Sequence, residues 1–76
     1  MATYNGHKNW NYWNVSLWIS NDEGLYSLAR ELKHACGNSR EAADQFIAML
    51  AENGHTETPD GARYTKSAVA KAIAGL

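Results

Sequence analysis

Apolar residues recur at helical spacing over most of the chain. Residues three or four apart lie on the same face of an α-helix, so a set with this spacing predicts an amphipathic helix with one buried stripe. Three sets follow the pattern: Leu25, Leu28, Ala29, Leu32 and Cys36; Ala42, Ala43, Phe46, Ile47 and Leu50; and Val69, Ala72, Ile73 and Leu76. The chain is therefore predicted to be mainly α.

Polar residues ahead of each stripe indicate where the helices begin. Ser20 and Glu23 have the spacing of a capping box, in which a hydroxyl and a carboxylate satisfy free backbone N–H groups. Asn38 or Ser39 is expected to begin the next helix, and Thr65 to cap the last one. These three positions divide the second part of the chain into separate short helices.

Glycine and proline residues indicate where the helices end. Gly37 is predicted to close the first stripe in the left-handed conformation, and Gly54 is predicted to end the second. The only proline lies in Thr58-Pro59-Asp60-Gly61, a sequence typical of a turn. A turn or small hairpin near Pro59 should therefore connect the last two helices.

Residues 10–19 fit two patterns. Trp13, Val15, Leu17 and Ile19 alternate as in a strand, whereas helical spacing relates Trp10, Trp13, Leu17 and Trp18. We expect a helix here, because no convincing second strand lies nearby to pair with this segment.

Residues 2–9 have no periodicity and are expected to form an irregular arm. The predicted fold is thus a small bundle of about four short helices with an N-terminal arm.

Size and composition point to one small globular domain spanning residues 1–76. The 76 residues are 45% hydrophobic and 20% charged, which is too apolar for a disordered chain. A net charge of −1 argues against a cationic nucleic-acid clamp, and a single cysteine excludes an intramolecular disulfide. No secretion signal or membrane span is evident, so we expect a cytoplasmic protein with no membrane partner.

No residue pattern indicates catalysis, a cofactor or a metal. His7, His34, His55 and Cys36 lack the paired spacing of a zinc site. The serines lack a nucleophile elbow, and the glycines do not form a phosphate-binding loop. We therefore expect a protein without enzymatic activity.

Aromatic residues gather near the start of the chain and predict a protein-binding surface. Three tryptophans are too many for easy burial in so small a core, and exposed aromatic side chains often dominate protein interfaces. We expect Trp13 and Leu17 to be core residues. The candidate protein-binding residues are Trp10, Tyr12 and Trp18.

A second candidate surface lies at the basic end of the chain. Residues 61–76 contain no acidic side chain, and a helix N-terminus favours phosphate. Glu57 and Asp60 in the adjacent turn weaken this interpretation. The candidate nucleic-acid-binding residues are Arg63, Tyr64, Thr65, Lys66, Ser67 and Lys71.

The N-terminal third resembles a group of short uncharacterised proteins from phages and mobile elements. The segments that carry the resemblance are Tyr4-Asn5-Gly6, Asn9, Trp13-Asn14-Val15, Leu17-Trp18-Ile19 and Asn21-Asp22-Glu23-Gly24-Leu25-Tyr26. This resemblance implies a phage or plasmid origin and no defined activity.

The C-terminal third is similar to a helix-turn-helix segment of site-specific serine recombinases. The similar positions are Leu50, Gly54, Thr58-Pro59, Gly61, Tyr64, Ser67, Val69 and Ile73. In that family the helix after the turn recognises DNA. This chain departs from the pattern at Glu57 and Asp60, where basic residues are common, and it has no catalytic serine domain.

Two functions follow from these observations. The first is a small phage-type effector, without enzymatic activity, that binds a host or phage protein in the bacterial cytoplasm. Examples are inhibitors of a bacterial defence protein, such as anti-CRISPR or anti-restriction proteins, and inhibitors of a transcription protein. The alternative is a helix-turn-helix-like regulator that binds DNA through the C-terminal helix. A structural or assembly protein is a third class, and no particular oligomeric state is indicated.

Overall fold

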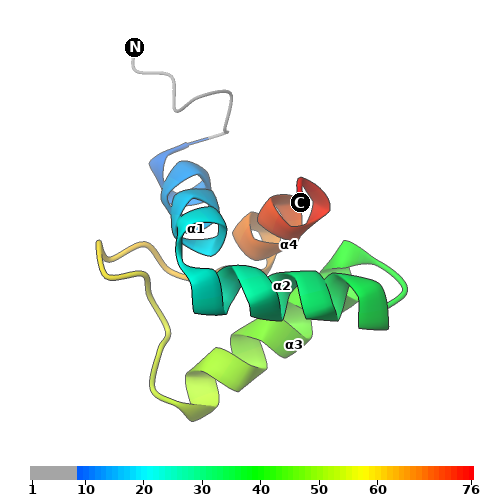
Figure 1. The fold of residues 1–76 in the computed structure, drawn as a ribbon. Coiled ribbons are helices and arrows are strands. Elements are labelled where there is room, and N and C mark those ends of the chain that lie inside the picture. Colours follow the sequence, from blue (N-terminus) through cyan, green and yellow to red (C-terminus); the bar gives the residue numbers. More distant parts are fainter. Residues whose placement is uncertain (1–8) are drawn as a thin grey trace.

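Four α-helices form the part of the chain that the computed structural model describes, residues 9–76. The helices are α1 (Trp10–Asn21), α2 (Glu23–Ala35), α3 (Ser39–Glu52) and α4 (Lys66–Ala74) (Figure 1). The predicted mainly α fold is confirmed, including the helix over residues 10–19. Residues 2–8 of the expected arm lie outside the described residues, and Asn9 caps α1 by accepting a hydrogen bond from the backbone N–H of Tyr12 at 3.0 Å.

The C-terminal helix α4 packs against each of the other three helices. Its buried residues include Val69, Ala72 and Ile73, as the apolar spacing predicted, and also Ala68. Alanine side chains permit the neighbouring helices to approach closely, which suits a helix with partners on several sides. The last helix in the sequence is thus a central element of the fold.

The core combines a few large side chains with many alanines. Its largest fully buried hydrophobic residues are Phe46, Ile19, Ile73, Val15 and Val69. The ring of Phe46 packs edge-to-face on Tyr64, with the ring centroids 5.9 Å apart. The alanines that fill the remaining space are Ala29, Ala42, Ala43, Ala62, Ala68 and Ala72.

Helix α1 turns a different face to the core than the sequence pattern indicated. Val15 and Ile19 are fully buried, whereas Trp13 and Leu17 are half-buried and do not belong to the core cluster. The prediction that Trp13 and Leu17 are core residues is therefore wrong. The β-branched side chains of Val15 and Ile19 belong to the core cluster, whereas the larger side chains of Trp13 and Leu17 lie outside it.

A single residue separates α1 from α2. Asp22 has extended backbone angles, donates its N–H to the carbonyl of Trp18 at 2.9 Å, and accepts the Leu25 N–H on its carboxylate at 3.0 Å. The predicted cap at Ser20 is wrong, because Ser20 lies inside α1. Aspartate caps as well as serine does, and its charge also favours the positive N-terminal end of α2.

The two predicted glycine caps have different outcomes. Gly54 has a φ of 80°, and it follows the end of α3 as expected. Gly37 is not left-handed, because the chain leaves α2 at Cys36 in an extended conformation and reaches Asn38, the extended N-cap of α3. Three residues thus connect α2 to α3, with Cys36 and Asn38 extended on either side of Gly37, and the connection lacks the tight reversal that would require a left-handed glycine.

The predicted turn near Pro59 forms a small hairpin. The N–H of Gly61 donates to the carbonyl of Thr58 at 2.8 Å, and Gly61 has a φ of 96°. Glu57 pairs with Arg63 in an antiparallel bridge on either side of this turn.

Within residues 9–76, no helix has the length and apolar character needed to cross a membrane.

Candidate functional site

A polar network that is buried at Asn14 and Thr58 and exposed at Asp60 fixes the hairpin to α1. Asn14 is only 1% exposed, and its Nδ2 donates to Oδ2 of Asp60 at 2.8 Å. The hydroxyl of Thr58 donates to Oδ1 of Asn14 at 2.6 Å and accepts the N–H of Ala62 at 3.0 Å. Both the donor and the acceptor of the Asn14 amide are therefore satisfied, which holds the turn in one position on the helix.

The same carboxylate also orients Trp18. The indole Nε1–H of Trp18 donates to Oδ2 of Asp60 at 2.9 Å. Hydrogen bonds from Asn14 and then Trp18 lower the pKa of the Asp60 carboxyl, because they stabilise its ionised form. Asp60 is thus a structural link between the turn and the tryptophan.

We expect replacement of Asp60 by asparagine to change how stability depends on pH. A carboxyl with a lowered folded pKa stabilises the fold fully above its unfolded value, near 3.8. That contribution is lost as the pH falls through the lowered folded pKa. The stability difference between wild type and Asp60→Asn should therefore shrink between about pH 6 and pH 2.5. Urea unfolding followed by circular dichroism at several pH values measures it, and a difference that grows in acid would contradict this role.

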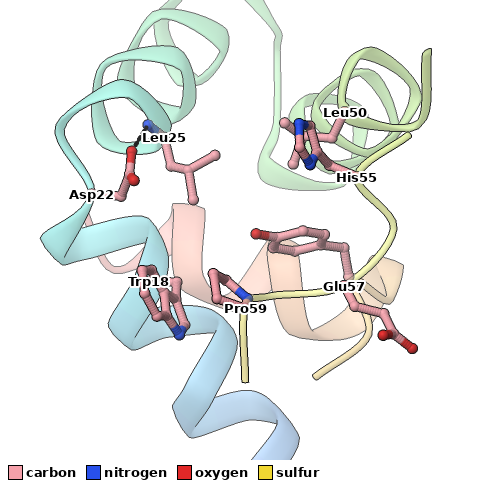
Figure 2. A pocket seen from close by; sticks show the side chains of 8 residues that line it. Trp18, Asp22, Leu25, Leu50, His55, Glu57 and Pro59 are labelled. Carbon is pink, nitrogen blue, oxygen red and sulfur yellow. Dashed lines mark hydrogen bonds between the residues drawn. The ribbon is translucent and has the colours of Figure 1, made fainter. Parts of the chain in front are cut away.

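Next to this network, a groove of about 310 Å³ opens on the surface. It lies between the end of α1, the first turn of α2, the end of α3 and the hairpin (Figure 2). The residues that line it are Trp18, Asp22, Leu25, Leu50, His55, Glu57, Pro59 and Tyr64. Two stretches that are distant in sequence, residues 18–25 and residues 50–64, thus build one concave site.

The walls of the groove are largely apolar and carry acidic groups. Trp18 and Pro59 lie side by side on one wall, opposite Leu25 and Leu50 (Figure 2). Burial, and secondly the negative charge of Asp22, raise the pKa of Tyr64. Apolar walls with a few polar groups are typical of sites that bind a ligand or a partner side chain.

A second hollow on the surface is larger but lacks such walls. Its volume is about 440 Å³, and it is bordered mainly by small side chains. The residues that line it are Ser16, Ser20, Lys71, Ala72, Ala74, Gly75 and Leu76. Without an aromatic or large aliphatic wall except Leu76, it offers less apolar surface to a partner than the groove beside Trp18 does.

The structure separates the three residues predicted to bind protein. Trp18 lines the groove, but Trp10 is 39% exposed at the other end of α1, about 12 Å away along the helix axis. Tyr12 is half-buried and packs against the core. The groove therefore includes one of the three candidates, Trp18.

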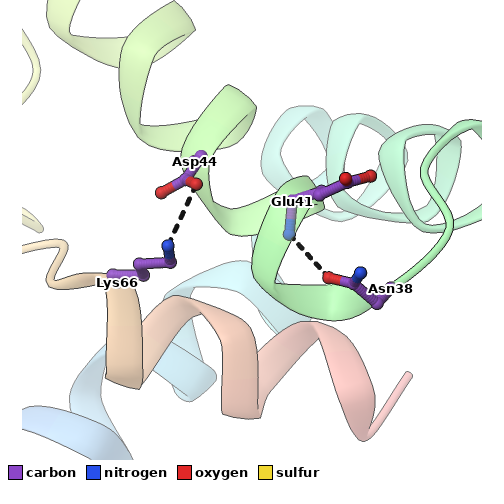
Figure 3. Close-up of polar contacts among 4 residues, drawn as sticks. All are labelled: Asn38, Glu41, Asp44 and Lys66. Atoms are coloured by element: carbon purple, nitrogen blue, oxygen red, sulfur yellow. Dashed lines mark hydrogen bonds and ion pairs between the residues drawn. The ribbon is translucent and has the colours of Figure 1, made fainter.

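Five of the six residues predicted to bind nucleic acid are exposed, and Tyr64 is buried. Tyr64 is buried and lines the groove, and the hydroxyl of Thr65 caps α4 by accepting the N–H of Ala68. Lys66 forms an ion pair with Asp44 on α3 at 3.1 Å (Figure 3). Thr65 and Lys66 are nevertheless exposed, as are the remaining three residues, Arg63, Ser67 and Lys71.

Sequence reasoning missed most of the groove and its supporting network. Asn14 had a detectable signal, because it is a polar residue within an apolar segment that becomes buried on folding. The other signal was the turn sequence around Pro59, which predicted the turn but not the helix it contacts.

Within residues 9–76, no group of three or more His, Cys, Asp or Glu residues is placed to hold a metal ion.

The chain matches no curated protein and no solved structure. It does match the model of DUF7249, a family of unknown function, over residues 1–74. Because this match covers nearly the whole chain, the protein belongs to the DUF7249 family.

Proposed function

We propose that this protein is a small non-enzymatic effector that binds a host protein through the groove beside Trp18 and thereby modulates it. It acts in the cytoplasm of a bacterial host, where an inhibitor of a defence or transcription protein fits its size. The observation that carries this proposal is the groove of about 310 Å³ with apolar walls. Its resemblance to short phage proteins over the N-terminal third supports the same class of function.

The groove has the properties of a preformed protein-binding site. Trp18 is held by its hydrogen bond to Asp60, so little side-chain freedom is lost when a partner contacts it. Tryptophan and tyrosine contribute disproportionately to binding energy at protein interfaces. A fixed tryptophan beside Pro59 and Tyr64 therefore supports protein binding at this place.

The position of α4 favours a protein partner over DNA. A helix that recognises DNA must present its side chains to the major groove. In this fold α4 packs against three helices, and its first basic residue, Lys66, is paired with Asp44. The net charge of −1 supplies little attraction for phosphate.

A matched pair of arginine variants tests the proposed site. Pro59→Arg places a bulky side chain in the groove at an exposed turn position, whereas Met49→Arg adds the same side chain at a 43% exposed position of α3 outside the groove. We expect Pro59→Arg to reduce capture of the partner from host lysate about tenfold or more, and Met49→Arg to have little effect. Quantitative mass spectrometry of the captured proteins measures this difference.

The controls separate loss of the site from loss of the fold. Circular dichroism should show the same helical content for both variants, because the first central position of a turn accepts most residues. Equal capture by Pro59→Arg and the wild type would contradict the groove as the binding site. If Trp10→Ala instead abolished capture, the interface would lie at the start of α1.

A further inference from the structure

Within residues 9–76 neither acidic group at the groove forms an ion pair, although Arg63 lies opposite Glu57 in the bridge of the hairpin. Asp22 and Glu57 line the groove together with His55, and no lysine or arginine does. Oδ1 of Asp22 accepts the N–H of Leu25, and Oδ2 accepts no hydrogen bond within residues 9–76. Figure 2 shows Glu57 extending outward at the rim, whereas Asp22 lies beside Leu25 at the groove.

The aromatic side chains of the groove also favour a positive charge. The face of an indole or phenol ring attracts cations, and tryptophan does so most strongly. The indole nitrogen of Trp18 points away from Leu25 and Leu50 (Figure 2), where it donates to the carboxylate of Asp60. A hydrogen bond from the indole N–H to a carboxylate polarises the ring toward greater electron density, which strengthens its attraction for a cation.

We propose that the groove receives an arginine or lysine side chain of the partner protein, an inference that rests on the proposed function. The aliphatic stem of this side chain packs against Leu25 and Pro59, and the charged group lies between Trp18 and the free oxygen of Asp22. Arginine and lysine combine an apolar stem with a charged end, which matches apolar walls beside a carboxylate. A volume of about 310 Å³ suits one long side chain with parts of its neighbours.

The apolar walls indicate a peptide segment rather than a free small cation. Leu50 lies on the same side of the groove as His55, away from Asp22 (Figure 2), and offers apolar surface that a cationic group alone does not cover. Apolar residues next to the arginine or lysine in the partner would bury this surface. The expected ligand is therefore a basic residue flanked by aliphatic residues.

Two peptides of equal shape test the role of charge. Acetyl-Leu-Arg-Leu-amide carries the cation, and the same peptide with citrulline replaces it with a neutral group of nearly equal size. Titrating each into the ¹⁵N-labelled full-length protein should shift the Trp18 indole signal and the Leu25 and Tyr64 amide signals. We expect the arginine peptide to bind about three- to fivefold more tightly in about 20 mM salt. In about 300 mM salt this preference should decrease, because salt screens exposed charges.

Variants identify the carboxylate responsible. Asp22→Asn keeps the helix cap, since asparagine caps as well as aspartate does, but it removes the charge. We expect this variant to lose the preference for arginine, whereas Glu31→Gln, on an exposed position of α2 outside the groove, should keep it. Equal binding of both peptides, a preference unchanged in Asp22→Asn, or no shift with either peptide would each overturn the inference. The proposed function has its own separate test in the capture by Pro59→Arg.

Discussion

Replacement of Phe46 by alanine should lower the free energy of unfolding by about 3–5 kcal/mol. Phe46 is fully buried, and it is the largest fully buried side chain in the described part of the domain. Removing its ring leaves a cavity and ends the edge-to-face contact with Tyr64, which supports one wall of the groove. A domain of this size has a total stability of only about 5–10 kcal/mol, so the variant should be largely unfolded at moderate urea concentrations.

Urea unfolding followed by circular dichroism measures this loss, with a graded series as the control. Phe46→Leu retains most of the buried volume and should lose about 1.5 kcal/mol or less. Met49→Ala removes a side chain that is 43% exposed on the same helix and should lose much less than Phe46→Ala. A similar loss for Phe46→Ala and Met49→Ala would show that the core does not depend on the phenylalanine ring.

Replacement of Asn14 by leucine should cost about 1–3 kcal/mol, although the two side chains have the same number of heavy atoms and the same branching. The change removes the acceptor of the Thr58 hydroxyl, and Thr58 is only 4% exposed. It also removes the donor that holds the Asp60 carboxylate. The hairpin should then separate more readily from α1, and the Trp18 indole should lose its fixed position.

Amide hydrogen exchange measures how firmly the hairpin is held against α1. Amide hydrogen exchange should accelerate in residues 56–64 more than in α3, because the network holds the hairpin while α3 has its own core contacts. Asn21→Leu, at an exposed position of the same helix, is the matched control and should leave exchange in the hairpin unchanged. Unaltered exchange in the hairpin of Asn14→Leu would show that other contacts hold it in place.

The three later helices were predictable because each has one apolar stripe. Phe46 and Leu50 in α3, like Val69 and Ile73 in α4, follow helical spacing, and they are buried as expected. In such a helix, the sequence pattern and the buried face coincide, since a single side is apolar. The hairpin was predictable for a local reason as well, because proline and glycine favour turn conformations wherever they lie.

The buried face of α1 was not predictable in this way. Tryptophans and leucine on one side compete with Val15 and Ile19 on the other, so periodicity alone does not select a face. The choice depends on Asn14, whose burial requires partners from the hairpin 44 residues later in the chain. The local sequence shows Asn14 as a polar residue in an apolar segment, but it does not identify the distant partners that satisfy its side chain.

The groove was unpredictable for a related reason. Its walls come from the ends of three helices and from the hairpin, and no two of these segments form a recognisable motif together. Asp22 shows the difficulty, because its position before a helix explains a cap as readily as a binding residue. Trp18 and Leu25 lie within four residues of Asp22, and only the packed structure brings this segment against Leu50, Pro59 and Tyr64.

The central position of α4 also constrains how the domain is made in the cell. Synthesis proceeds from the N-terminus, and α4 is the last of the four helices to leave the ribosome. Until it emerges, α1 and α3 lack a helix against which both pack, and the core cluster that includes Val15, Ile19 and Phe46 is incomplete. The domain therefore completes its core only after α4 has left the exit tunnel, and it cannot fold helix by helix as the chain emerges.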